Sequence, residues 1–155
     1  MIDITLPDGS IREYNSGVTA HEVALSISEG LARNILSAEV NGEVWDSNRP
    51  ITESSNVKLL TWNDDKGKET MWHSSAHLMA EAIQYFYPET KFAIGPPIEN
   101  GFYYDFDLGG KTISDNDFKK IEDKMLELAR QKNEYVRKEI SKDDALAYFK
   151  EKKDE

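Results

Sequence analysis

Two of the three histidines in the chain, His73 and His77, are four residues apart. An α-helix advances by about 100° per residue, so residues at this spacing lie one turn apart on the same face. A separate apolar face is formed by residues at helical spacing, namely Trp72, Ala76, Met79, Ile83 and Phe86. The pattern therefore predicts a helix that buries its apolar face and presents two imidazoles on a neighbouring one.

The histidine pair has three interpretations. Two histidines at this spacing can bind a metal ion, but the metalloprotease motif has Glu directly after the first His, and Ser74 is at that position here. A second interpretation is acid–base catalysis or orientation of a water or a ribose hydroxyl, because imidazole titrates near neutral pH. The third is a pair of ordinary solvated helix residues. The pair alone predicts no metal site and leaves the last two interpretations open.

A second group of candidate residues follows the expected helix. Gly95 precedes two prolines, which indicates a close approach of the backbone either to a substrate or to a neighbouring strand. Residues 99–101 predict a turn, after which Phe102, Tyr104 and Phe106 alternate on one face of a strand. A tyrosine among buried aromatic residues needs a polar partner for its hydroxyl, which a substrate or a backbone group could supply.

The composition limits the possible functions. The chain has 155 residues and a net charge of −10, so contact with nucleic acid would require a local basic patch or another segment. The basic residues within 119–142 are interleaved with acids, which leaves open a solvated face or an RNA-facing stripe. There is no cysteine, which excludes disulfides and thiolate zinc sites. No signal segment or membrane span is indicated, so we expect a cytoplasmic protein.

The first 62 residues have the pattern of a small mixed sheet with one main helix. A hairpin is predicted over 2–14, and Thr19 with Glu22 forms the capping box of a helix. The pair Asn41-Gly42 is typical of a two-residue hairpin turn, and another strand is predicted over 57–61. This order of elements fits a ubiquitin-like sheet curled over a helix.

Residues 63–68 contain no apolar side chain and are predicted to be a linker. The pair Gly67-Lys68 is not part of a phosphate-binding loop, because Trp62 and Glu69 occupy positions where that motif needs Gly and Ser or Thr.

The last part of the chain is predicted to be a helix, a strand and a helix. The first helix begins after Ser114, a strand is expected over 134–140, and the second helix begins after Ser141. In that second helix, Leu146 and Phe149 are expected to face inward.

These motifs together resemble the amino-terminal part of bacterial threonyl-tRNA synthetases. The resemblance is carried by the small first unit, by His73-Ser-Ser-Ala-His77-Leu, and by Ala93-Ile-Gly-Pro-Pro-Ile-Glu-Asn-Gly-Phe-Tyr-Tyr-Asp-Phe-Asp107, and it covers the entire chain. It implies an α+β protein in which residues 1–62 form a ubiquitin-like (β-grasp) TGS domain and 63–68 form a linker. Residues 69–155 would be the amino-terminal part of the tRNA editing domain, which in this family continues beyond residue 155.

The resemblance also implies an activity. The family ligates threonine to its tRNA with ATP, Mg and a zinc ion, all held in a catalytic domain outside these residues, so no cofactor is expected in this chain. The editing domain hydrolyses mischarged seryl-tRNA. By position, His73 and His77 would be catalytic residues of the editing site, and Tyr104 and Gly95 would contact the substrate. The expected partner is the acceptor end of threonine-specific tRNA, with no membrane, and the full-length family is expected to form homodimers through domains absent here.

One departure from the family pattern affects this expectation. The editing site of the family is completed by a Cys-x-x-x-His motif and a Lys from a later segment, and this chain has no Cys. We therefore expect the isolated chain to have little or no activity. Two alternatives remain: a non-enzymatic TGS-containing regulatory or RNA-binding module, and a free-standing trans-editing deacylase.

Overall fold

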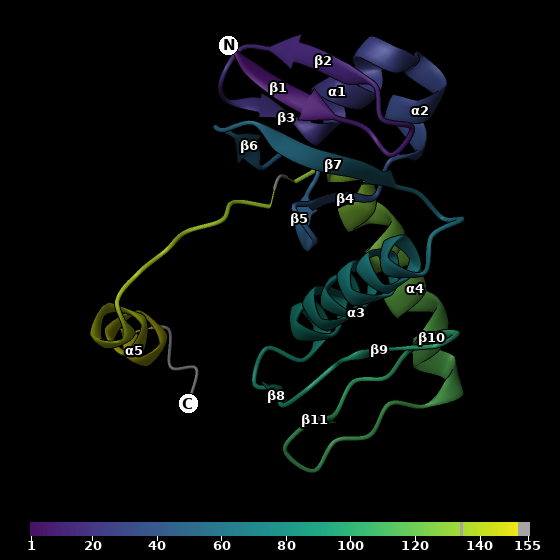
Figure 1. Cartoon of the computed structure of the whole chain (residues 1–155). Coiled ribbons are helices and arrows are strands. Elements are labelled where there is room, and N and C mark those ends of the chain that lie inside the picture. The colour runs from purple at the N-terminus through teal and green to yellow at the C-terminus, as the bar shows by residue number, and fades with distance from the viewer. Residues whose placement is uncertain (134, 152–155) are drawn as a thin grey trace. The chain divides into compact units, whose positions relative to one another are not determined.

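The computed structural model describes residues 1–133 and 135–151 (Figure 1). It contains two compact units: one comprises Met1–Ser75 with Pro97–Phe102, and the other comprises Ala76–Pro96 with the residues from Tyr103 onward. One helix, α3 (Asp65–Phe86), continues across the boundary between them.

The first unit is built on a five-stranded sheet in the order β2-β1-β7-β4-β5. Its strands are β1 (Ile2–Thr5), β2 (Ile11–Tyr14), β4 (Ser37–Val40), β5 (Glu43–Asp46) and β7 (Ser55–Leu60). β1 and β7 are parallel, whereas the other neighbouring strands are antiparallel. A short strand pair, β3 (Val18–Thr19) with β6 (Pro50–Ile51), and the helices α1 (Ala20–Ile27) and α2 (Glu29–Asn34) complete the domain. This mixed sheet with its helices confirms the predicted α+β class.

Local sequence rules explain how the helix and the second hairpin of this unit form. The Thr19 backbone N–H donates to the Glu22 carboxylate at 2.8 Å, and the Glu22 N–H donates to the Thr19 hydroxyl at 3.2 Å, which is the predicted capping box. Asn41 and Gly42 both have positive φ, at 50° and 91°, as a type I′ turn between β4 and β5 requires.

The core of the first unit follows the alternation of its strands. Ile2 and Ile4 are buried in β1 while Asp3 between them is exposed, and Val57 is buried in β7. Val23 of α1 belongs to the same buried cluster, so the helix packs on the sheet through this side chain.

Helix α3 begins earlier than the sequence pattern suggested. It starts at Asp65, so only the first two residues of the expected linker 63–68 precede it. Gly67 explains the early start, because an ideal Cβ at this position would lie 2.1 Å from the Thr61 carbonyl oxygen. The absence of a side chain lets the first turn of the helix pack on the preceding backbone. The segment was predicted to be a linker because a glycine among polar residues is also typical of linkers.

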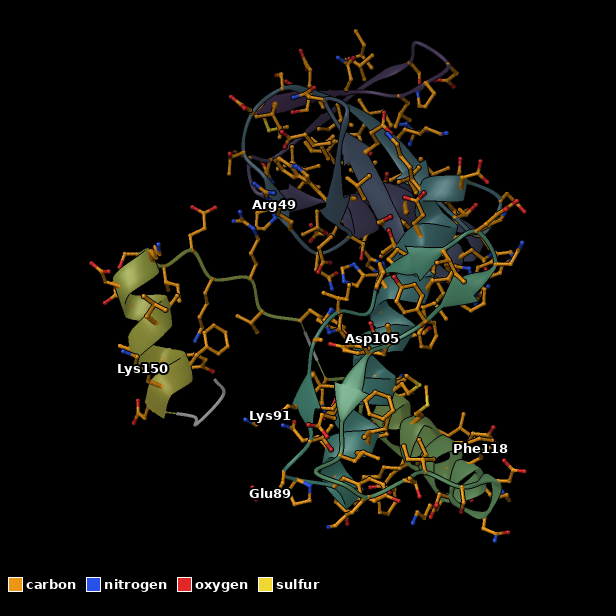
Figure 2. All side chains as sticks on the ribbon, turned by 90° about the horizontal axis from the view of Figure 1, so that it is seen from below. Arg49, Glu89, Lys91, Asp105, Phe118 and Lys150 are labelled. Carbon is orange, nitrogen blue, oxygen red and sulfur yellow. The ribbon has the colours of Figure 1, made fainter. Side chains whose placement is uncertain are left out.

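The second unit packs α4 (Asp115–Gln131) against the carboxyl-terminal part of α3. Its buried cluster consists of Ala82 and Ile83 from α3 and Ile121 from α4. The short strands β8 (Lys91–Phe92) and β11 (Phe106–Asp107) pair antiparallel and add Phe92 and Phe106 to this cluster. Figure 2 labels Lys91 on β8, Asp105 directly before β11 and Phe118 on α4.

A second short strand pair, β9 (Pro97–Ile98) with β10 (Gly101–Phe102), belongs to the first unit. Glu99 and Asn100 connect these strands, which confirms the predicted turn. The predicted alternation of burial after the turn is confirmed, because Phe102, Tyr104 and Phe106 are half-buried while Tyr103 and Asp105 are exposed. The predicted single strand is wrong, because residues 103–105 are not a strand and the short strands β10 and β11 (Phe106–Asp107) pair with different partners.

Two expectations near the end of the chain were wrong. Residues 135–140 form no strand, and the predicted strand also includes residue 134, which lies outside the described residues. Helix α5 (Lys142–Glu151) forms as predicted, but Leu146 and Phe149 are 50% and 47% exposed instead of inward. The apolar pattern specifies faces suited to burial, but burial also needs a partner, and none of the described residues buries these two side chains.

Within residues 1–133 and 135–151, no helix combines the length and the apolar composition that crossing a membrane would need.

Candidate functional site

The two histidines lie on exposed positions of α3. His73 and His77 are one helical turn apart and both are exposed, whereas Ala76 and Ile83 of the same helix are buried. The apolar face therefore fixes the rotation of the helix about its axis, and this rotation leaves both imidazoles accessible. The predicted separation between the apolar face of this helix and the face that carries the histidines is confirmed.

Among the described residues, the structure contains no group of three or more His, Asp or Glu side chains placed to hold a metal ion. The histidine pair therefore has no third protein ligand in this part of the molecule, and we derive no metal-dependent step from it.

Tyr104 lies in the second unit, between β10 and β11. Its ring is half-buried and makes an edge-to-face contact with Phe92, with ring centroids 5.4 Å apart and an interplanar angle of 76°. Within residues 1–133 and 135–151, the Tyr104 hydroxyl has no hydrogen-bond partner. Packing therefore orients this ring, and its hydroxyl keeps its hydrogen-bonding capacity for a ligand.

Gly95 is the second neighbour of the Tyr104 ring. An ideal Cβ built on Gly95 would lie 2.3 Å from Cδ2, 2.5 Å from Cε2 and 2.7 Å from Cγ of Tyr104. Such distances do not occur in proteins, so any side chain at this position would displace the ring. The requirement for glycine here is one of space. It corresponds to the close backbone approach predicted from the sequence, and in the structure the approaching group is the Tyr104 ring.

The backbone holds these two positions side by side. The Ala93 N–H donates to the Asp105 carbonyl at 2.9 Å, and the Asp105 N–H donates to the Ile94 carbonyl at 2.9 Å. These bonds extend the pairing of β8 with β11 toward Gly95 and Tyr104. The pairing is non-local, so the contact between Gly95 and Tyr104 could not be read from either segment alone.

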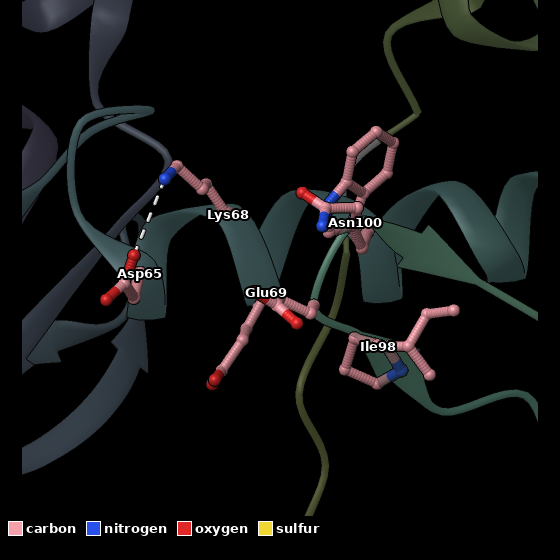
Figure 3. A pocket seen from close by; sticks show the side chains of 8 residues that line it. Asp65, Lys68, Glu69, Ile98 and Asn100 are labelled. Atoms are coloured by element: carbon pink, nitrogen blue, oxygen red, sulfur yellow. Dashed lines mark hydrogen bonds and ion pairs between the residues drawn. The ribbon is translucent and has the colours of Figure 1, made fainter.

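The first unit contains a cavity of about 670 Å³ that sequence reasoning did not identify (Figure 3). It lies along the first turns of α3 and the β9–β10 hairpin, and its lining residues are Asp65, Lys68, Glu69, Trp72, Pro97, Ile98, Glu99 and Asn100. The only signal in the sequence was the helical spacing that places Asp65, Glu69 and Trp72 on one side of α3.

The cavity carries an excess of negative charge. Its lining has three carboxylates and one amine, and that amine, on Lys68, lies 3.4 Å from the Asp65 carboxylate. The Trp72 ring at its wall is held edge-on by Trp62, with centroids 5.4 Å apart, and is tilted against Phe102 at 6.4 Å. Because phosphate oxygens would be repelled by this lining, we do not assign an RNA backbone to this cavity.

A polar cluster supports the start of α3. The Asp64 carboxylate accepts the Thr61 backbone N–H at 3.0 Å and lies 2.8 Å from the Lys58 ammonium. These contacts, that with Lys58 foremost, hold the pKa of Asp64 below its usual value, and the same ion pair raises the pKa of Lys58. The carboxylate thus stays ionised where the backbone turns from β7 into the helix that carries both histidines.

Comparison with known proteins finds a family match for the first unit and similar proteins for the whole chain. Residues 2–61 match the TGS domain family. The chain is 66% identical over 154 residues to the threonine–tRNA ligase of Cytophaga hutchinsonii, an alignment that covers 99% of the chain and 24% of that protein. The corresponding enzymes of Parabacteroides distasonis and Porphyromonas gingivalis are 56% and 53% identical, again over the whole chain and 24% of their own length. The chain is homologous over its whole length to threonine–tRNA ligases.

This homology confirms the resemblance drawn from the sequence motifs, including the β-grasp TGS domain. The chain spans about a quarter of the length of these ligases. His73, His77, Tyr104 and Gly95 lie in the part of the chain that follows the region matched by the TGS domain family.

Proposed function

We propose that this chain is the amino-terminal part of a threonine–tRNA ligase and that its role in the whole enzyme is to hydrolyse seryl-tRNA. The observation that carries the proposal is the 66% identity to a threonine–tRNA ligase over 99% of the chain. The ligation of threonine to its tRNA, with ATP and metal ions, is assigned to the three quarters of the enzyme that these residues do not include.

The chemistry of the substrates explains the need for such a step. Serine lacks one methyl group of threonine, and one missing methyl group in a binding pocket provides only about 1–3 kcal/mol of discrimination. A ligase that must reach greater accuracy needs a second site that accepts the smaller amino acid and releases it from the tRNA.

We assign the catalytic role to His73 and His77. Both imidazoles are accessible on α3, and imidazole can accept a proton from an attacking water or orient that water near the terminal ribose. The aminoacyl ester is already activated, so a positioned water and hydrogen-bond donors suffice for its hydrolysis.

We assign substrate contact to Tyr104 and Gly95. The Tyr104 hydroxyl is available to a ligand, and Gly95 gives the ring the space for its observed orientation. The proposed partner is the acceptor end of threonine-specific tRNA. The net charge of −10 means that most of the affinity for its phosphates must come from the rest of the enzyme.

A chimera tests this function. Residues 1–155 would replace the matching region of the Cytophaga hutchinsonii ligase, which supplies the catalytic domain and the remainder of the editing domain. The chimera is expected to deacylate seryl-tRNA and to leave threonyl-tRNA intact, and the 155-residue chain alone is expected to show little or no hydrolysis. A chimera that threonylates tRNA normally but does not hydrolyse seryl-tRNA would contradict the proposal, and an isolated chain as active as the chimera would favour a free-standing deacylase.

A further inference from the structure

We infer that Phe92 is a positioning residue that sets the orientation of the Tyr104 ring. The consequence for hydrolysis rests on the proposed function, whereas the packing relationship does not. Phe92 itself is not assigned any contact with substrate.

The Tyr104 ring is held by packing and not by a hydrogen bond. Within the described ranges 1–133 and 135–151 its hydroxyl makes no hydrogen bond, so a polar anchor does not fix the ring. The backbone of the next residue is fixed, since Asp105 donates to Ile94 and accepts from Ala93, both at 2.9 Å. The remaining freedom is rotation of the side chain about its own torsions.

Gly95 and Phe92 limit this rotation. Gly95 lies against the ring carbons Cγ, Cδ2 and Cε2, and Phe92 meets the ring edge-to-face at a centroid distance of 5.4 Å. Gly95 provides space but no attractive side-chain contact. Phe92 supplies the directional contact, because edge-to-face aromatic pairs favour one relative orientation.

Phe92 is itself held in place by the core of the second unit. It pairs with Phe106 across β8 and β11, with ring centroids 6.2 Å apart, and both rings pack against the buried cluster of Ala82, Ile83 and Ile121. The core of the second unit therefore fixes the Phe92 ring, and the Phe92 ring in turn orients Tyr104.

This packing matters for catalysis because the hydroxyl is at the far end of the ring. A small rotation about the side-chain torsions displaces the hydroxyl more than any other atom of the residue. A misplacement of about 1 Å can lower a catalytic rate by roughly 100-fold. Replacing Phe92 by an aliphatic residue should therefore affect the chemical step more than substrate binding.

The test uses the chimera with Phe92→Leu. We expect kcat for seryl-tRNA hydrolysis to fall by about tenfold while KM changes by less than about twofold. Phe92→Tyr, which keeps the aromatic ring, is expected to retain most of the activity. Leu128→Ala is the matched control, because it removes packing from the same buried cluster on α4 and leaves both phenylalanine rings in place, so it should leave kcat within about threefold of the parent. Equal losses for Phe92→Leu and Leu128→Ala would overturn the inference.

A double-mutant cycle separates positioning from general loosening. In a Tyr104→Leu background, Phe92→Leu should cause no further loss in kcat, because the ring on which it acts is already gone. A further tenfold loss in that background would show that Phe92 acts by another route.

A measurement on the 155-residue chain does not depend on the function. The Tyr104 ring protons should show a nuclear Overhauser effect to the Gly95 Hα protons, which reports the orientation of the ring because Gly95 lies against Cδ2 and Cε2. This effect should weaken in Phe92→Leu and persist in Leu128→Ala. If it behaves in this way but Tyr104→Phe hydrolyses seryl-tRNA normally, the proposed role of the Tyr104 hydroxyl fails and the positioning stands. If it is unchanged in Phe92→Leu, the positioning itself is contradicted.

Discussion

Gly95 and Tyr104 lie so close together that the ring of the tyrosine fills the space that a side chain at position 95 would need. The family resemblance implied that both residues contact a substrate. The structure adds a direct relationship between them, since Gly95 sets the position that the Tyr104 ring can adopt. A substitution at either residue should therefore be analysed for its effect on the other.

Gly95→Ala is predicted to force the Tyr104 ring out of its position. The Cβ would lie 2.3 Å from a ring carbon, and overpacking of this kind typically lowers the free energy of unfolding by about 1–3 kcal/mol. Thermal or urea unfolding of the 155-residue chain measures the change. Gly30→Ala in α2 is the matched control, because the nearest atom to its Cβ is 3.9 Å away, and stability there should be unchanged or higher. Equal stability of the two variants would mean that the ring moves aside without cost.

Gly67→Ala is predicted to disturb the first turn of α3. Its Cβ would lie 2.1 Å from the Thr61 carbonyl oxygen, which is backbone and cannot rotate away as a flexible side chain can. We expect a loss of about 1–3 kcal/mol in the free energy of unfolding and lower helical circular dichroism. A variant with the stability and spectrum of the parent would show that the helix starts later than Asp65 in solution.

Asp117 is predicted to contribute stability that is lost in acid. Its contact with the Lys120 ammonium, together with the N–H and hydroxyl of Ser114, holds the pKa of this carboxyl well below its usual range. A carboxyl with a lowered pKa in the folded state stabilises the fold above its unfolded pKa of about 3.9, and the contribution disappears as the pH falls below that value.

The measurement for Asp117 is the melting temperature as a function of pH. Asp117→Asn should melt below the parent at pH 7, and the difference should shrink as the pH falls from about 4 to 2. The control is Asp115→Asn, in the same helical turn, which should keep the acid-dependent decrease of the parent. A difference between Asp117→Asn and the parent that stays constant from pH 7 to 2 would contradict this account.

The sequence predicted those features that depend on residues close together in the chain. The capping box of Thr19 and Glu22, the turn at Asn41 and Gly42, and the alternation around Tyr104 each follow from local backbone chemistry, and all are present. The histidine face of α3 was likewise predictable, because apolar spacing fixes which side of a helix is buried.

Other features required information that local patterns do not contain. The contact of Gly95 with Tyr104 depends on the register of β8 with β11, and the early start of α3 depends on the approach of Gly67 to Thr61. Leu146 and Phe149 are a case in which the local pattern was misleading. Their helical spacing indicates burial, but none of the described residues covers them.

The most direct test of the central claim is the rate of seryl-tRNA hydrolysis by the chimera with both His73→Ala and His77→Ala. We predict that hydrolysis falls at least 100-fold while threonylation of tRNA is unchanged, a loss in the range typical of removing general acid–base catalysis. The control is His21→Ala, which changes the third histidine, in the TGS domain, and should leave hydrolysis unchanged. Hydrolysis at the parent rate in the double variant would contradict the assignment of these histidines to editing.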